Sequence, residues 1–252
     1  MPPEYERNPL RAVGAVTRRL SSGRSAFLGT GFVARHEHAF LTAAHCIGDL
    51  KPDELLVECP EIPRVVPVKA IDRHPTADLA LLTLDLVEGS GMRALWGLTT
   101  HDGRFDFASV GVDFNAYGFP ESTMFGDDPP MPTARLFKGH IQRYLDHATP
   151  GGRYRYVAGE LSIPAPAGLS GGPLLSEAGS YAYGLVTENL ESYTTLDEVE
   201  QLRLGDKVVA TTRYRRVITY GLALMFGEKG VAEWLNSRIP PHPIHEGTPG
   251  WL

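Results

Sequence analysis

The chain has 252 residues, of which 42% are hydrophobic and 21% charged, and its formal net charge is −6. These values are typical of a globular protein with a sizeable core, arranged as one large domain or two small ones. The sequence lacks the clustered Lys and Arg of a nucleic-acid-binding domain, and no apolar run approaches the roughly 18 residues that span a bilayer. We therefore expect neither a nucleic acid nor a membrane as a partner.

The cysteine content and the first residues of the sequence indicate the cellular compartment of the protein. The chain begins MPPEYER, without the basic and then apolar segments of a signal peptide. Its two cysteines, Cys46 and Cys59, are fewer than a secreted disulfide scaffold normally carries. These features predict a cytoplasmic protein with two unpaired thiols, although a chain whose signal peptide had been removed would look the same.

Strands are predicted along both halves of the chain, because short apolar or β-branched runs alternate with Gly, Pro and charged clusters. In the first half these runs cover residues 26–34, 39–42, 55–58, 65–71 and 79–84. A Gly-rich and polar segment, 86–103, is the candidate link between the two halves. In the second half the predicted strands are residues 107–117, 134–144, 154–163, 173–175, 183–187 and 217–224.

Two helices are also predicted. Thr195 and Glu198 have the spacing of a capping box, and Gly205 is a suitable stop for a helix that begins there. The apolar stripe of this helix would consist of Leu196, Val199 and Leu202. The second predicted helix covers residues 229–238, and its apolar residues at helical spacing are Val231, Trp234 and Leu235.

The sequence GLSGGP at residues 168–173 is the strongest indication of a catalytic site in the chain. A serine hydroxyl is a poor nucleophile unless a base removes its proton, and the oxyanion that forms after attack needs backbone donors. Glycines around Ser170 allow the backbone to turn so that the N–H groups of Gly168 and Ser170 point into one small space. The alternative is a plain Gly-Pro turn.

A candidate base and a candidate carboxylate precede this serine. His45 lies in TAAHC at residues 42–46, directly after a predicted strand, where a rigid element would leave one ring nitrogen accessible. Asp78 lies in HPTADLALL at residues 74–82, directly before another strand. A buried carboxylate there would accept the Nδ1–H of His45 and stabilise the imidazolium. A structural histidine and an exposed aspartate are the alternatives.

The three motifs, in the order His, Asp, Ser, resemble those of the trypsin-like, chymotrypsin-fold serine proteases over roughly residues 12–238. The resemblance implies a catalytic triad of His45, Asp78 and Ser170, with Gly168 and Ser170 forming the oxyanion hole. It also implies an all-β fold of two six-stranded antiparallel Greek-key barrels with a short C-terminal helix. Residues 1–103 would form the barrel that carries His and Asp, and residues 104–252 the barrel that carries Ser.

Smaller motifs, GTGFV at 29–33 and YGFP at 117–120, are similar to those of bacterial HtrA-type and other intracellular trypsin-like peptidases. The sequence GLVT at 184–187 is similar to the family's strand that binds substrate backbone. By this likeness, Thr187, Glu188 and Asn189 line the cleft. Pro164 falls near the position where trypsin carries its pocket carboxylate, so a preference for Arg or Lys is unsupported.

The chain departs from secreted trypsins in two ways. Leu169 stands where zymogens have the Asp that receives the new N-terminus, and Cys46 has no upstream cysteine to pair with. The zymogen switch is therefore absent, and the oxyanion hole is either preformed or ordered by something else. The segment 188–216 is longer than a simple hairpin needs. We consider it as a lid or docking site that controls access to the cleft; the alternative is a surface segment without such a role.

These features predict a serine endopeptidase that hydrolyses peptide bonds through an acyl-enzyme, without a metal or an organic cofactor. Its expected partners are a protein or peptide substrate and, as a further candidate, a regulatory protein. Two alternatives remain open: a latent protease that needs a partner for activation, and a non-catalytic protein-binding module on a protease scaffold.

Overall fold

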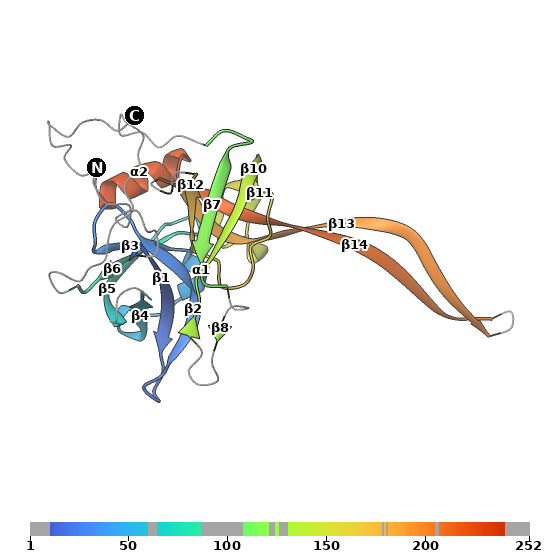
Figure 1. The fold of residues 1–252 in the computed structure, drawn as a ribbon, viewed down its shortest axis with the longest axis horizontal. Coiled ribbons are helices and arrows are strands. Elements are labelled where there is room, and N and C mark those ends of the chain that lie inside the picture. The colour runs from blue at the N-terminus through green and yellow to red at the C-terminus, as the bar shows by residue number, and fades with distance from the viewer. Residues whose placement is uncertain are drawn as a thin grey trace.

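The computed structural model describes residues 11–59, 65–86, 108–120, 124–125, 131–177, 179, 181–204 and 207–239. Within them the chain is mostly strand and forms two closed antiparallel barrels (Figure 1). The first barrel has the strand order β1-β2-β3-β6-β5-β4 and closes where β4 pairs with β1. Its strands are β1 (Val13–Arg19), β2 (Ser25–Val33), β3 (Ala39–Thr42), β4 (Leu55–Glu58), β5 (Val65–Arg73) and β6 (Ala80–Leu84).

The second barrel repeats this topology. Taken from β7, its order is β7-β10-β11-β14-β13-β12, and β12 pairs back with β7. Its strands are β7 (Asp113–Gly118), β10 (Arg135–Ala148), β11 (Arg155–Leu161), β12 (Pro173–Ser176), β13 (Ala182–Leu204) and β14 (Lys207–Met225). A separate two-stranded sheet pairs β8 (Met124–Phe125) with β9 (Met131–Pro132). The predicted fold class is therefore confirmed.

The predicted boundary between the two barrels, at residues 103 and 104, lies outside the described residues, as does all but the first residue of the predicted link 86–103. The division into residues 1–103 and 104–252 therefore stays a prediction. It is consistent with the strands, because the six of the first barrel end at Leu84 and the second barrel begins at Asp113.

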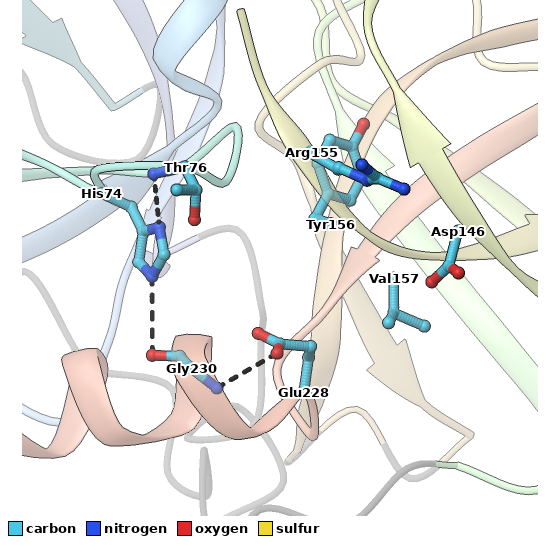
Figure 2. Close-up of a pocket in the computed structure, with 8 residues that line it drawn as sticks. All are labelled: His74, Thr76, Asp146, Arg155, Tyr156, Val157, Glu228 and Gly230. Atoms are coloured by element: carbon cyan, nitrogen blue, oxygen red, sulfur yellow. Dashed lines mark hydrogen bonds between the residues drawn. The ribbon is translucent and has the colours of Figure 1, made fainter. Parts of the chain in front are cut away.

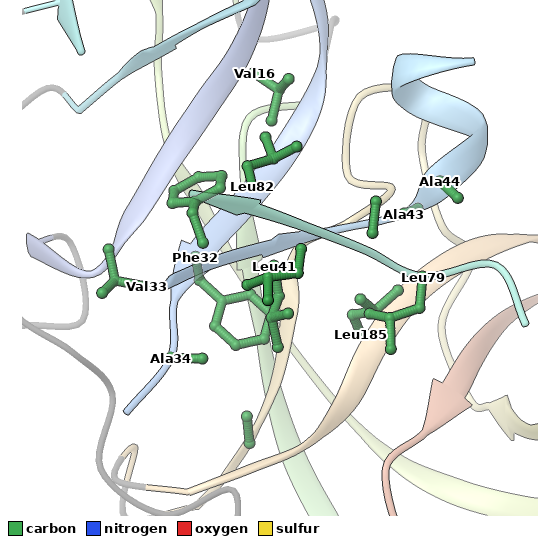
Figure 3. Close-up of a cluster of buried hydrophobic side chains, with 14 of the residues drawn as sticks. Val16, Phe32, Val33, Ala34, Leu41, Ala43, Ala44, Leu79, Leu82 and Leu185 are labelled. Atoms are coloured by element: carbon green, nitrogen blue, oxygen red, sulfur yellow. The ribbon is translucent and has the colours of Figure 1, made fainter. Parts of the chain in front are cut away.

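The hydrophobic core joins the two barrels. One cluster of buried side chains contains Phe32, Leu41 and Leu82 from the first barrel and continues to Leu185 of β13 (Figure 3). The same cluster includes Trp234 of the C-terminal helix. A second cluster, around Phe114, Ile141 and Leu174, lies within the second barrel. Because one cluster spans both barrels, burial of apolar surface fixes their relative position as well as stabilising each one.

Two short helices accompany the barrels. The helix α1 (Ala44–Ile47) follows β3 directly, and α2 (Lys229–Arg238) follows β14. The carboxylate of Glu228 caps α2 by accepting hydrogen bonds from the N–H groups of Gly230 and Val231. Val231, Trp234 and Leu235 are buried, so the helix predicted at residues 229–238 is confirmed. Two 3-10 turns lie at Pro52–Glu54 and Pro150–Gly152.

The helix predicted from Thr195 is wrong. β13 stays extended through this segment and pairs with β14 from Gly184↔Met225 to Leu204↔Lys207, forming an arm that projects from the barrels (Figure 1). The capping-box pattern is local, whereas a strand is stabilised by its partner. Here the partner segment is rich in β-branched residues, with the sequence VVATT at 208–212, which favours pairing over a helix.

Candidate active site

His45 and Asp78 are in direct contact. His45 lies in α1, immediately after β3, and Asp78 lies two residues before β6. The ring Nδ1 is 2.6 Å from Asp78 Oδ2, and the backbone N–H of His45 donates to Asp78 Oδ1 over 2.8 Å. The carboxylate is 1% exposed. Because both of its oxygens bond to His45, the ring is held with Nδ1 protonated and Nε2 directed away from Asp78.

The pKa of His45 is raised above its ordinary value of 6.5. Burial of the ring lowers this pKa, but the hydrogen bond to Asp78 and then the contact with the Cys46 thiol raise it by more. The Cys46 Sγ atom lies 3.6 Å from His45 Nε2. The ring therefore holds its proton to higher pH than a free histidine would.

The loop that carries Asp78 is shaped by His74, which the sequence analysis did not single out. His74 Nδ1 accepts hydrogen bonds from the N–H groups of Thr76 and Ala77, at 3.2 and 2.8 Å. Its Nε2 faces the Gly230 carbonyl of α2, and its ring packs edge-on against Trp234. Burial lowers the pKa of His74, which keeps the ring neutral and able to accept these bonds.

A pocket of about 210 Å³ adjoins this loop (Figure 2). It lies between His74 and Thr76 of the first barrel, β10 and β11 of the second, and the start of α2. None of the residues predicted to be catalytic or to bind substrate lines it. The pocket therefore marks a junction between the two barrels, beside the loop that carries Asp78.

Contacts between the barrels hold the loop that carries Ser170 against the first barrel. The Ser170 carbonyl accepts the N–H of Thr30 in β2 over 2.9 Å, and the Thr30 hydroxyl donates to the Gly168 carbonyl over 2.7 Å. Cys46 Sγ also lies 3.6 Å from the Ser170 carbonyl. Thr30 is fully buried, so it holds the carbonyls of the serine loop toward the first barrel.

The amide groups of this loop divide into two sets. Those of Leu169, Gly171 and Gly172 donate to carbonyls of the second barrel. Within the part of the chain that the structure describes, the N–H groups of Gly168 and Ser170 have no hydrogen-bond acceptor. Gly168 has φ +90°, in the left-handed region that favours glycine. The N–H groups of two residues on either side of Leu169 are thus left available for a ligand.

The hydroxyl of Ser170 donates to the Thr187 carbonyl over 2.5 Å. A protonated imidazole has no lone pair with which to accept a proton, so this direction of the hydroxyl agrees with the raised pKa of His45.

The residues predicted to bind substrate lie along this loop and the adjoining strand. Thr187 is buried, and its hydroxyl donates to the Leu222 carbonyl. Asn189 pairs through its side chain with Ala165, the neighbour of the exposed Pro164. The carboxylate of Glu188 lies 2.6 Å from His147 Nε2, so this side chain is held by a hydrogen bond and does not extend freely into solvent.

Gly171 should be intolerant of any side chain, which gives a first prediction. Its φ is +85°, and a Cβ atom would lie 2.0 Å from the Thr30 carbonyl oxygen and 3.0 Å from the Ala43 nitrogen. Gly171→Ala should lower the free energy of unfolding by about 3 kcal/mol, from backbone strain and overlap together. Denaturant unfolding measures this loss.

The matched control is Gly111→Ala, because Gly111 has φ +86° but open space around it. We expect this variant to lose only about 1 kcal/mol, from the backbone conformation alone. Equal losses in the two variants would contradict close packing of the serine loop against the first barrel.

The structure also bears on the other expectations. Cys46 and Cys59 are both free, as predicted. Among the described residues, no helix combines the length and the apolar character needed to cross a membrane. The cytoplasmic location stays a prediction.

Comparison with known proteins identifies the family of the chain. The family model of the trypsin-like peptidase domain matches residues 29–185. No curated protein matches the chain.

Several solved structures share the fold. The Rv3671c protease from M. tuberculosis in its active form is 17% identical, with 96% of this chain and 88% of that chain covered and a TM-score of 0.59. Its inactive form is 18% identical, with coverage of 92% and 90% and a TM-score of 0.56. The HtrA-type protease AlgW, solved with a decapeptide, is 18% identical, with coverage of 93% and 66% and a TM-score of 0.56.

The matched model covers more than half of the 252 residues and includes all three motifs. At these identities the structural likenesses show the fold, which is the one described above. The chain therefore belongs to the trypsin-like peptidase family and is a serine endopeptidase.

Proposed function

We propose that the chain cleaves peptide bonds with Ser170 as nucleophile, His45 as general base and Asp78 as the residue that orients His45. The observation that carries this proposal is the double hydrogen bond from Asp78 to the ring and backbone of His45, beside a serine loop held by Thr30. Asp78 keeps Nδ1 protonated, so Nε2 is the nitrogen that receives the serine proton.

In the reaction, Ser170 Oγ attacks the substrate carbonyl carbon while its proton passes to His45 Nε2. The negative charge that develops on the carbonyl oxygen is stabilised by the N–H groups of Gly168 and Ser170. His45 then gives its proton to the departing amine nitrogen as the C–N bond breaks, which leaves an acyl-enzyme. Water attacks the acyl carbon with His45 again accepting a proton, and that proton returns to Ser170 Oγ as the acid leaves.

The substrate backbone is proposed to lie along Thr187, Glu188 and Asn189. The position of Thr187 supports this placement, because its carbonyl is within hydrogen-bond distance of Ser170 Oγ. Pro164 borders the same region from the loop that leads to Ser170. A protein or peptide substrate is therefore the proposed partner.

A latent form of the same enzyme is the second candidate. It is favoured by the hydroxyl of Ser170, which donates to Thr187 and not to His45. A regulatory protein could then act through the arm of β13 and β14, because β13 also carries Thr187. The arm projects away from the barrels (Figure 1), which favours a docking site over a lid. Labelling of the purified chain alone by a fluorophosphonate would exclude the latent form.

The pH dependence of peptide hydrolysis tests the proposed function. A base must be neutral to act, and the pKa of His45 is raised. We therefore expect the rate on denatured casein to rise with pH, with a midpoint above the ordinary histidine value of about 6.5. Cys46→Ala should move the midpoint to lower pH, since the Cys46 thiol contributes to the raised pKa.

Two outcomes would count against this account. Absence of hydrolysis at every pH would contradict the proposed activity. A rate that stays level from about pH 5 to 9 would contradict the role of His45 as base.

A further inference from the structure

We infer that Asn189 restricts the enzyme to substrates with a small, uncharged residue on the acyl side of the cleaved bond. The inference rests on the proposed function of Ser170. Its basis is a pair of hydrogen bonds between one side chain and one backbone unit. The N–H of Ala165 donates to Asn189 Oδ1 over 2.6 Å, and Asn189 Nδ2 donates to the Ala165 carbonyl over 2.7 Å.

The location of the hydrogen-bonded pair Asn189–Ala165 determines its effect on the choice of substrate. Two chain segments flank Ser170: residues 164–169, which lead into it, and Thr187–Asn189, which Ser170 Oγ contacts through the Thr187 carbonyl. With the substrate backbone along Thr187–Asn189, as proposed above, the side chain of the residue whose carbonyl Ser170 attacks faces the space between these segments. Asn189 and Ala165 bridge that space.

The strand β14 also limits the space between residues 164–169 and Thr187–Asn189. Gly221 is the register partner of Asn189, and its N–H donates to the Ile163 carbonyl over 2.7 Å. A Cβ atom on Gly221 would lie 2.7 Å from that carbonyl oxygen and 3.2 Å from the Ala165 nitrogen. Since not even a methyl group fits here, the segment 163–165 lies directly against the strand pair and no deep pocket separates them.

A large substrate side chain could enter only by displacing Asn189. Ala165 is 5% exposed, so displacement would leave its N–H and carbonyl without partners in a buried place. A basic side chain such as Lys meets a second obstacle, because the carboxylate next to Asn189 on this strand, that of Glu188, is already paired with His147 at 2.6 Å. The two segments also contain the small residues Ala165, Ala167 and Thr187, which suit a small substrate residue such as Ala or Val.

The test uses fluorogenic peptides that differ only in the residue before the cleaved bond: Ala, Val, Leu, Phe or Lys. The wild-type chain should hydrolyse the Ala and Val peptides with kcat/KM about 100-fold above the Phe and Lys peptides. Asn189→Ala removes both hydrogen bonds and should reduce the Ala-to-Phe ratio to about 10-fold or less, by raising the rate on the Phe peptide.

Asn115→Ala is the matched control. Asn115 also donates from Nδ2 to a backbone carbonyl of the second barrel, that of Glu177, but away from the segments beside Ser170. This variant should keep the wild-type ratio. Asn189→Asp retains the acceptor for Ala165 N–H while losing the donor, so its ratio should fall between those of the wild type and Asn189→Ala.

Equal rates of the wild-type chain on the Ala and Phe or Lys peptides would overturn the inference, and this result does not depend on any variant folding. An unchanged ratio in a folded Asn189→Ala or Asn189→Asp protein would overturn it too. Failure to hydrolyse any of the five peptides, together with no reaction with a fluorophosphonate, would instead overturn the proposed function.

Discussion

Ser170→Ala should lower kcat/KM for peptide hydrolysis by about 10⁴-fold or more. The variant loses the atom that would form the acyl-enzyme, while the backbone N–H groups of Gly168 and of residue 170 remain to stabilise a slow direct attack by water. Initial rates with a peptide that the wild type cleaves give this ratio directly.

The fold should survive this change. The contact between the serine loop and the first barrel uses the Ser170 carbonyl and the N–H of Thr30, and these are backbone atoms. The free energy of unfolding should therefore stay within about 1 kcal/mol of the wild-type value. Activity within tenfold of the wild type would mean that another residue is the nucleophile.

Asp78→Asn should have the second largest effect, a loss of about 10⁴-fold in kcat near neutral pH. One carboxylate oxygen accepts the backbone N–H of His45 and the other faces Nδ1. An amide that keeps the first bond must turn its NH₂ group toward Nδ1. Nδ1 then becomes the acceptor and Nε2 carries the proton, so His45 can no longer take the proton of Ser170.

Asp72→Asn provides the control for Asp78→Asn. Asp72 accepts a hydrogen bond from Arg238 at the surface of the same barrel, and its side chain is 45% exposed. We expect its kcat to stay within about twofold of the wild type, because exposed ion pairs contribute little. A loss of less than tenfold in Asp78→Asn would contradict the proposed orientation of His45.

The sequence predicted those parts of the structure that depend on local pattern. The strands at residues 39–42 and 55–58 and the helix at 229–238 have the predicted bounds, because each is a short apolar pattern with clear ends. The strand β1 was missed, since VGAVTRR ends in charged residues and its stability comes from pairing with both β2 and β4. The helix predicted from Thr195 failed for the same reason, as its segment is stabilised by β14.

In the candidate site, too, the local motifs could be predicted and the contacts between distant segments could not. The three motifs predicted His45, Asp78 and Ser170, and the structure brings the first two within 2.6 Å. The supporting contacts could not be predicted, because they join distant parts of the chain. Thr30 and Gly168 are 138 residues apart in the sequence, and His74 faces Gly230 across 156. The HPTAD sequence predicted a role for its aspartate alone, and only the folded loop shows that its histidine bonds to the backbone just before Asp78.

The most direct test of the account is reaction of the purified chain with a fluorophosphonate, followed by mapping of the modified residue by mass spectrometry. An assembled His45–Asp78 pair should activate Ser170 alone among the serines, so we predict one adduct, on Ser170 Oγ, that is absent from Ser170→Ala and from denatured protein. A folded wild-type chain that gives no adduct, or an adduct at another serine, would contradict the central claim that Ser170 is the nucleophile of this peptidase.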